Sequence, residues 1–180
     1  NMWIEHFRVL GAGCESTHSG IHLDGGAGNS ITKSFVTGCS GNGIMLDSAF
    51  APLSHCQVDA EVHDSFRGLS LSGKSQEKMD AIYIAGTYTK NREAGVMVSN
   101  ATNVILGDCD VSDNEKYGVL LQGKSGARGC IISSRCKIAN NGIDIAELHG
   151  SINNWVFGAT SPEASENHSI NHRTIKEYSK

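Results

Sequence analysis

The tetrad Gly95-Val96-Met97-Val98 decides the fold, because its pattern of glycine, aliphatic residue, any residue and aliphatic residue recurs along most of the chain. Successive copies lie 23 to 27 residues apart, and the other five begin at Gly20, Gly43, Gly68, Gly118 and Gly142. Aliphatic residues two positions apart lie on the same face of a β-strand. We therefore expect a strand at each copy, and a repeat of this length is typical of solenoid proteins.

Polar turns precede the tetrads, at Ser40-Gly41-Asn42, Asp64-Ser65, Lys90-Asn91, Asp113-Asn114 and Asn140-Asn141. Asn, Asp and Gly tolerate left-handed backbone angles, so a tight corner can recur there. A second alternating segment lies before each turn, as in residues 104–111 and 131–138, and is long enough for two short strands with a bend. Each repeat then contains three strands, and three strands per turn form a coil.

The predicted fold class is all-β, a right-handed parallel β-helix of about seven rungs with three short strands per rung. Strict two-residue alternation and a glycine at the head of every repeat oppose a helical solenoid. The motif of leucine-rich repeats is absent. We expect residues 1–158 to form the β-helix domain and residues 159–180 to form a polar tail or cap that leads to a missing segment. Because residue 1 already lies in a strand-like pattern, we expect the chain to be a fragment of a longer protein.

The composition excludes some functions. A net charge of −4 and a pI near 6.0 argue against a nucleic-acid partner, because phosphate binding needs a basic surface. No apolar run reaches the length of a membrane span, so no membrane association is expected. The six cysteines contain no C-x-x-C pair, and Cys56, Cys109, Cys130 and Cys136 lie in strand-like runs. We expect reduced cysteines in the core, with Cys109 and Cys136 at matching places in successive repeats.

The glycine tetrads and Asn-containing turns together resemble the pectate-lyase-like superfamily of β-helix proteins. That superfamily includes polysaccharide lyases, glycoside hydrolases, epimerases and bacteriophage tailspike depolymerases. Met2-Trp3-Ile4-Glu5-His6 is similar to the V-W-I-D-H segment of pectate lyases, with Glu5 in place of the aspartate. Other motifs of pectate lyases and polygalacturonases are not recognisable. The resemblance covers about residues 1 to 158 and implies a tailspike or polysaccharide depolymerase fragment.

The resemblance also implies that outward side chains on the first strand of each rung line a substrate groove. Hydrolysis of a glycosidic bond needs two carboxyl groups, and a lyase needs a base and a group that neutralises a uronate. The predicted catalytic residues are Glu5, Asp59, Asp108 and Asp110, with Asp59 and Asp108 in rungs two apart. The predicted substrate-binding residues are Trp3, His6, Lys33, Tyr83 and Arg135. The same acids can instead be ordinary solvated residues of alternating strands.

Two functions stay open. The first is a carbohydrate-active β-helix that binds and cleaves a polysaccharide as a hydrolase or a lyase. The second is a non-catalytic structural or adhesin-type β-helix of a phage tail fibre or surface protein. No metal site and no cofactor are expected, except calcium if the reaction is that of a lyase. The expected partner is a polysaccharide, a homotrimer is compatible with the resemblance, and the expected location is extracellular or on a phage virion.

Overall fold

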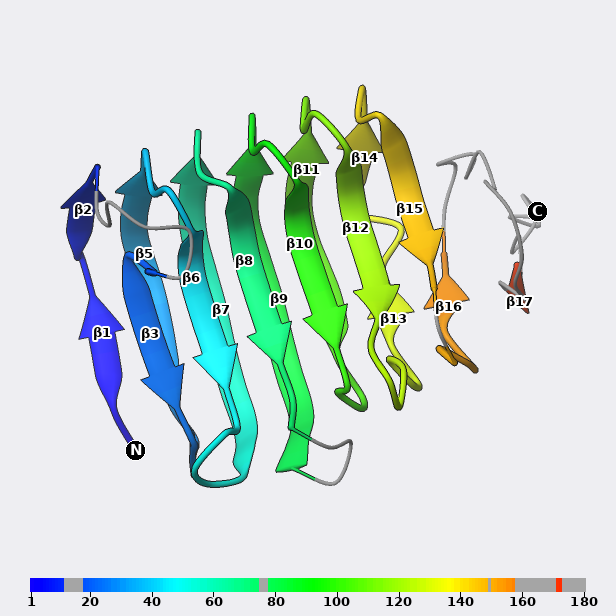
Figure 1. Ribbon diagram of the computed structural model, residues 1–180, viewed down its shortest axis with the longest axis horizontal. Coiled ribbons are helices and arrows are strands. Elements are labelled where there is room, and N and C mark those ends of the chain that lie inside the picture. Colours follow the sequence, from blue (N-terminus) through cyan, green and yellow to red (C-terminus); the bar gives the residue numbers. More distant parts are fainter. Residues whose placement is uncertain (12–17, 75–77, 149, 158–170, 173–180) are drawn as a thin grey trace, which may run out of the picture.

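The computed structural model describes residues 1–11, 18–74, 78–148, 150–157 and 171–172. The chain winds into a solenoid in which two parallel sheets lie in layers and strands of successive turns stack side by side (Figure 1). Six turns contribute a strand to each sheet, and a seventh turn begins with β16. The predicted parallel β-helix is therefore confirmed, with six complete turns in the described residues where about seven rungs were expected.

The larger sheet, called sheet A, contains the strands that precede each corner. They are β1 (Trp3–Glu5), β2 (Arg8–Leu10), β4 (Gly26–Ala27), β5 (Ser30–Thr37), β7 (Leu53–His63), β9 (Met79–Thr89), β11 (Ile105–Ser112), β13 (Ile131–Ile132), β14 (Lys137–Ala139), β16 (Trp155–Val156) and β17 (Asn171–His172). β17 lies in the segment expected as a tail or cap, and it pairs with β16.

The smaller sheet, called sheet B, contains the strands that carry the tetrads. They are β3 (Ile21–Asp24), β6 (Asn42–Asp47), β8 (Arg67–Ser72), β10 (Ala94–Ser99), β12 (Tyr117–Gln122) and β15 (Ile143–Glu147). All the pairs between neighbouring strands of this sheet are parallel. The two short strands expected before each corner join into one continuous strand in β7, β9 and β11.

The inward side chains of the tetrads stack in a column through the solenoid. Ile44 pairs with Leu69, Leu69 with Val96, and Val96 with Val119, and all four are fully buried between the sheets. They belong to one continuous apolar cluster that also takes side chains from sheet A. Burial of apolar surface stabilises the solenoid by about 25 cal/mol for each Å² removed from water.

The sixth tetrad does not keep the register of the other five. Val119 pairs with Ile145, so Gly142-Ile143 lies two residues earlier in its turn than Gly118-Val119 does. The reason is that Gly142 directly follows Asn141, whereas three residues separate Asn114 from Gly118. The expected strand does form at the last copy, but it is shifted by two residues relative to the other five.

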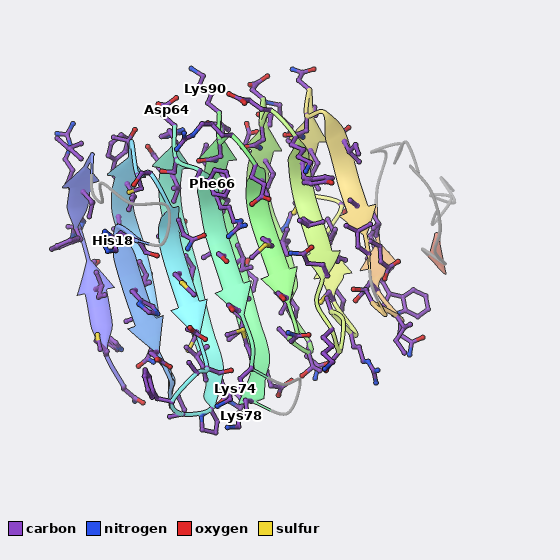
Figure 2. All side chains as sticks on the ribbon, in the orientation of Figure 1. His18, Asp64, Phe66, Lys74, Lys78 and Lys90 are labelled. Carbon is purple, nitrogen blue, oxygen red and sulfur yellow. The ribbon has the colours of Figure 1, made fainter. Side chains whose placement is uncertain are left out.

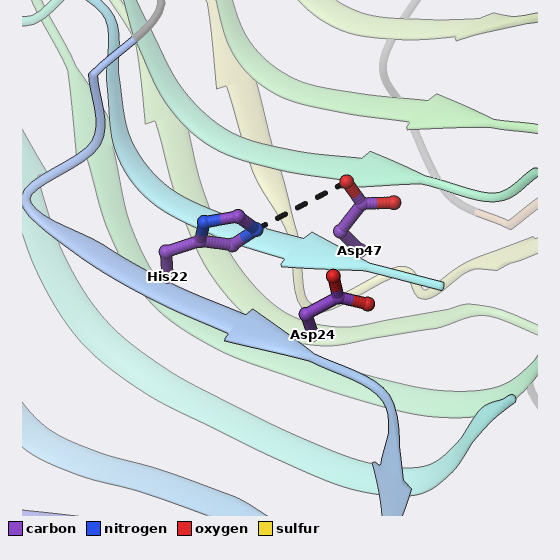
Figure 3. A group of neighbouring side chains, drawn as sticks. All are labelled: His22, Asp24 and Asp47. Atoms are coloured by element: carbon purple, nitrogen blue, oxygen red, sulfur yellow. Dashed lines mark ion pairs between the residues drawn. The ribbon is translucent and has the colours of Figure 1, made fainter. Parts of the chain in front are cut away.

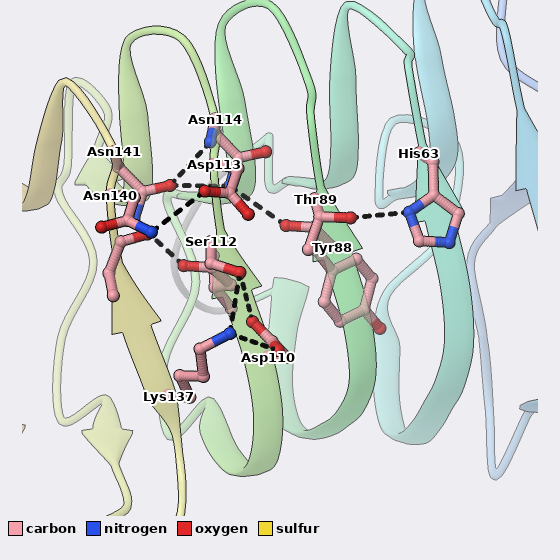
Figure 4. A network of polar contacts seen from close by, with 12 residues as sticks. His63, Tyr88, Thr89, Asp110, Ser112, Asp113, Asn114, Lys137, Asn140 and Asn141 are labelled. Carbon is pink, nitrogen blue, oxygen red and sulfur yellow. Dashed lines mark hydrogen bonds and ion pairs between the residues drawn. The ribbon is translucent and has the colours of Figure 1, made fainter.

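Asparagine side chains form a ladder along the corner before sheet B (Figure 4). Asn91 Nδ2 donates to Asn114 Oδ1 at 3.0 Å, and Asn114 Nδ2 donates to Asn141 Oδ1 at 2.8 Å. The same oxygens accept the backbone N–H groups of Asn91 and Asn114 at 3.0 Å. The ladder satisfies buried backbone donors that strand pairing leaves unbonded at a corner.

We call the corner residue whose side chain bonds to the neighbouring turn the ladder position. The residue directly before each ladder position has a left-handed backbone. The φ values of Asp64, Lys90, Asp113 and Asn140 lie between 52° and 59°, and Asp64 and Lys90 stand at neighbouring turns along one edge of the solenoid (Figure 2). The predicted left-handed corner is confirmed at these four positions.

A tight corner is expected from the sequence at Ser40-Gly41-Asn42, and this position is wrong. Ser65 continues the ladder, because its Oγ accepts the N–H of Cys39 at 3.2 Å. Cys39 rather than Asn42 therefore holds the ladder position of that turn, and a cysteine sulfur is only a weak hydrogen-bond acceptor.

The five described cysteines are free and buried, which confirms the predicted reduced core cysteines; Cys14 lies outside the described residues. Cys109 and Cys136 immediately precede the paired residues Asp110 and Lys137, so they occupy matching places in successive turns. In the part of the chain that the structure describes, no helix has the length and apolar character needed to cross a membrane.

Candidate functional site

The outward face of sheet A carries polar side chains in rows that run from turn to turn. Strand register places Glu5 beside Thr32, Thr32 beside Asp59, Asp59 beside Ala85, and Ala85 beside Asp108. Paired residues on one face of a sheet point the same way. One row therefore carries a carboxylate on every second turn.

Two bulges shape this face. Lys33 is an extra residue between the paired positions Thr32 and Ser34, and Gly107 is an extra residue between Leu106 and Asp108. Lys33 has a φ of 49°, which is unusual for a residue with a side chain. A bulge lets one strand change which alternate positions face outward, and bulges often re-aim side chains beside functional sites.

Two shallow hollows lie on the face between the first and fourth turns. One has a volume of about 360 Å³, and its lining includes Trp3, Glu5 and Gln57. The other has a volume of about 390 Å³, and its lining includes Lys33 and Asp59. Trp3 is 79% exposed, so it lies on the surface and not in the core, and its part in substrate binding stays a prediction.

Glu5 forms an ion pair across the bulge. Lys33 Nζ donates to Glu5 Oε1 at 2.9 Å, and His6 Nδ1 lies 3.8 Å from the same oxygen. The hydrogen bond and the charge of Lys33 hold the pKa of Glu5 below its ordinary value. Glu5 is therefore a carboxylate at neutral pH and lacks the raised pKa that a general acid needs.

Asp110 forms the second ion pair of the face (Figure 4). Lys137 Nζ donates to Asp110 Oδ2 at 2.9 Å, and Ser112 Oγ donates to Asp110 Oδ1. Burial raises the pKa of Asp110, but the hydrogen bonds and the charge of Lys137 outweigh burial, so the pKa is lowered. This carboxylate is also poorly suited to donate a proton.

Asp59 and Asp108 differ from these two acids. Among the residues that the structure describes, neither carboxylate has a Lys or Arg within 4.0 Å. Each pairs with Ala85, so they lie two strand spacings apart, or about 10 Å, as the sequence analysis predicts. Inverting glycosidases hold their two carboxyl groups roughly 6.5 to 9.5 Å apart, and flexible side chains can close this small difference.

The other predicted binding residues lie on the same face, farther along the solenoid. Tyr83 pairs with Gln57 and Ile105, and its ring lies against Gly107, where a side chain would collide with it. Arg135 is exposed in the link between β13 and β14. The structure therefore brings Trp3, Glu5, His6 and Lys33 together on the first two turns. Asp59, Tyr83, Asp108 and Asp110 follow along the next three turns, and Arg135 lies one turn beyond them.

Phe35 belongs to the face but was not predicted there. Its half-buried ring lines the second hollow, with the Arg8 guanidinium 5.3 Å from its centroid and the His63 ring at 5.6 Å. Simple alternation from the inward Ile31 would turn Phe35 inward, because both numbers are odd. The bulge at Lys33 reverses this phase, and only Val36, an inward aliphatic at an even position, signals the change in the sequence.

These features define a class, the parallel β-solenoids with a polar outward face on one sheet. The chain matches the family model described as right handed beta helix region over residues 16–175, and it therefore belongs to the right-handed β-helix family. This membership agrees with the predicted pectate-lyase-like fold. A search of the curated proteins found no match, and a search of the solved structures found none either.

Proposed function

We propose that the outward face of sheet A binds a polysaccharide whose chain runs from turn to turn along the rows of polar side chains. The hollows there are shallow and open, which suits a long polymer better than a small molecule enclosed in a pocket. Trp3 offers an exposed aromatic surface beside the carboxylate of Glu5, and amphipathic rings are suited to stacking on sugars.

We also propose that the bound chain is cleaved by hydrolysis, with Asp59 and Asp108 as the two carboxyl groups. The observation that carries this proposal is their position in one row, on either side of Ala85, without a basic partner. Their spacing favours the inverting reaction, in which a water molecule lies between one carboxylate and the sugar. Glu5 and Asp110 then bind and orient the chain rather than transfer protons.

A lyase is the less favoured reaction. Lyase chemistry needs a base with a free lone pair, whereas Lys33 Nζ donates a hydrogen bond to Glu5 Oε1 at 2.9 Å. A calcium cofactor is proposed only if the reaction is that of a lyase. If the chain is part of a depolymerase, we propose an extracellular or virion location and a trimeric, tailspike-like assembly.

The alternative is a β-helix that binds without cleaving or serves as a rigid rod. One observation favours it: Glu5 and Asp110, two of the four predicted catalytic acids, form ion pairs with Lys33 and Lys137, an arrangement common among solvated surface residues. In that case the polar rows provide solubility and contacts, and the loops at the edges of the solenoid carry recognition.

The test is incubation of the chain with a panel of capsular, O-antigen and pectic polysaccharides. We expect new reducing ends with at least one of them, without the ultraviolet absorbance of an unsaturated uronate. Asp59→Asn and Asp108→Asn should each lower the rate by about a hundredfold or more. Trp3→Ala should weaken binding of the polysaccharide to the chain.

Asp64→Asn is the matched control, because this carboxylate lies at the exposed corner, where Asn also tolerates the left-handed backbone. It should cleave like the unchanged chain. Binding without cleavage would support the non-catalytic alternative. If the folded chain neither binds nor cleaves any polymer of the panel, the proposal is overturned.

A further inference from the structure

Sheet B brings three potential metal ligands together on its outward face (Figure 3). His22 and Asp24 lie on β3, and Asp47 lies on β6. The available nitrogen and oxygen atoms of the three side chains all lie within 4.8 Å of one another. This cluster is on the opposite layer from the candidate polysaccharide face and has no part in the proposed cleavage.

Strand register fixes this arrangement. His22 and Asp24 are two residues apart on one strand, so both point to the same face, and Asp24 pairs directly with Asp47 on the next turn. Two carboxylates on directly opposite strand positions repel each other unless a cation lies between them. In the described residues no Lys or Arg forms an ion pair with either one.

The donor atoms are also directed toward one another. His22 Nε2 faces Asp47 Oδ2 at 4.0 Å, which is too long for a hydrogen bond and leaves room for an ion. Asp24 Oδ1 accepts the backbone N–H of Phe50 at 3.2 Å, which orients that carboxylate. Carboxylates that bind metal ions commonly accept such a hydrogen bond from a group outside the site, and the bond fixes their orientation.

We infer that His22, Asp24 and Asp47 bind a divalent transition-metal ion of the zinc type. The two carboxylates neutralise a 2+ charge, the imidazole nitrogen supplies a third ligand, and water completes the coordination at this open surface. The imidazole favours zinc over calcium and magnesium, which prefer oxygen ligands. Metal–ligand bonds of about 2.1 Å keep two donors within about 4.2 Å. His22 Nε2 and Asp47 Oδ2, at 4.0 Å, already meet this limit, and the three donor atoms, all within 4.8 Å of one another, need to draw only slightly closer on binding.

The experiment is calorimetric titration of the chelator-treated full chain with zinc chloride, repeated in the presence of excess calcium and magnesium. Cobalt(II) serves as a second probe, because its absorption bands report nitrogen and oxygen ligands directly. We expect one saturable site near one ion per chain that survives calcium and magnesium. His22→Ala and Asp47→Asn should each weaken zinc binding at that site by about tenfold or more.

His55→Asn and Asp64→Asn are the matched controls, because each removes an exposed potential ligand at a left-handed position that Asn tolerates. Both should bind zinc and cobalt like the unchanged chain. If His22→Ala fails to fold by circular dichroism, Asp24→Asn replaces it, since this change alters no volume. The absence of saturable zinc binding, or equal binding in the cluster variants and the controls, would overturn the inference.

Discussion

Replacement of Asn114 by alanine should be among the most damaging polar substitutions in the solenoid. Asn114 is 2% exposed and stands in the middle of the asparagine ladder. Its Oδ1 accepts from the backbone N–H and the Nδ2 of Asn91, and its Nδ2 donates to Tyr88 O at 3.0 Å and to Asn141 Oδ1 at 2.8 Å. Alanine removes all these bonds without giving water access to the corner.

The magnitude follows from the groups left unsatisfied. A buried donor that loses its partner costs about 1 to 3 kcal/mol, and each further hydrogen bond contributes about 1 kcal/mol net. The N–H of Asn91 loses its acceptor, while the Nδ2 of Asn91 keeps a long contact of 3.5 Å to Val62 O. We expect the free energy of unfolding to fall by about 2 to 4 kcal/mol, out of a total that is roughly 5 to 15 kcal/mol for most domains.

Equilibrium unfolding in urea, followed by circular dichroism, measures this loss. With a slope of about 3 kcal/mol per molar urea, the midpoint should fall by roughly 1 M. Asn140→Gly is the control, because Asn140 is exposed, has a φ of 58° that glycine adopts freely, and donates only to Asp113 Oδ1. A midpoint for Asn114→Ala within about 0.2 M of that control would refute the role given to the ladder.

Three further changes test the core, a close backbone contact and an ion pair. Leu69→Ala should lower the free energy of unfolding by about 2 to 5 kcal/mol in the same urea assay, because it leaves a cavity in the column between the sheets. Gly86→Ala should cost about 2 to 4 kcal/mol by thermal or urea unfolding, because its φ is 104° and the added methyl group would overlap the carbonyl oxygen of Ala60. Lys137→Met should raise the pKa of Asp110 in an NMR titration, because the cation that favours the carboxylate is lost.

Each of these changes has a result that would contradict its reasoning. Unfolding of Leu69→Ala at an unchanged midpoint would mean that the column is loosely packed. A Gly86→Ala chain as stable as the original would show that the strand can shift away from its neighbour. Lys124→Met is the control for the ion pair, because Lys124 is exposed and outside sheet A. An equal change of the Asp110 pKa in both lysine variants would show that the direct contact with Lys137 has no specific effect on this pKa.

The fold could be predicted from the sequence because its determinants are periodic and local. Each of the first five tetrads contains its own strand signal, and the interval between copies sets the size of a turn. The sixth copy shows where this reasoning ends. Gly142-Ile143-Asp144-Ile145 matches the tetrad pattern, but its register depends on the number of residues between Asn141 and the glycine.

The candidate sites were harder to predict, because they depend on interruptions of the pattern. The bulges at Lys33 and Gly107 change which side chains face outward, and alternation alone would place Phe35 on the inward side. The metal cluster did leave a signal: Asp24 and Asp47 each follow their tetrad directly. Equal offsets from equivalent tetrads predict stacked side chains, so this pair could have been found by aligning the repeats before searching for ligands.

The rows of the solenoid explain why the fold is so much easier to predict than its function. The inward column repeats one kind of residue from turn to turn, as Leu69, Val96 and Val119 do, because every turn must fill the same core. By contrast, an outward row of sheet A changes at every turn, from Gln57 to Tyr83 to Ile105. Stacking stabilises the backbone whatever these outward side chains are, since neighbouring turns interact chiefly through their ladders and their core. Selection for a ligand can therefore act on single outward positions without affecting the coil, and the proposed polysaccharide face and the proposed metal cluster can be lost or gained independently of each other.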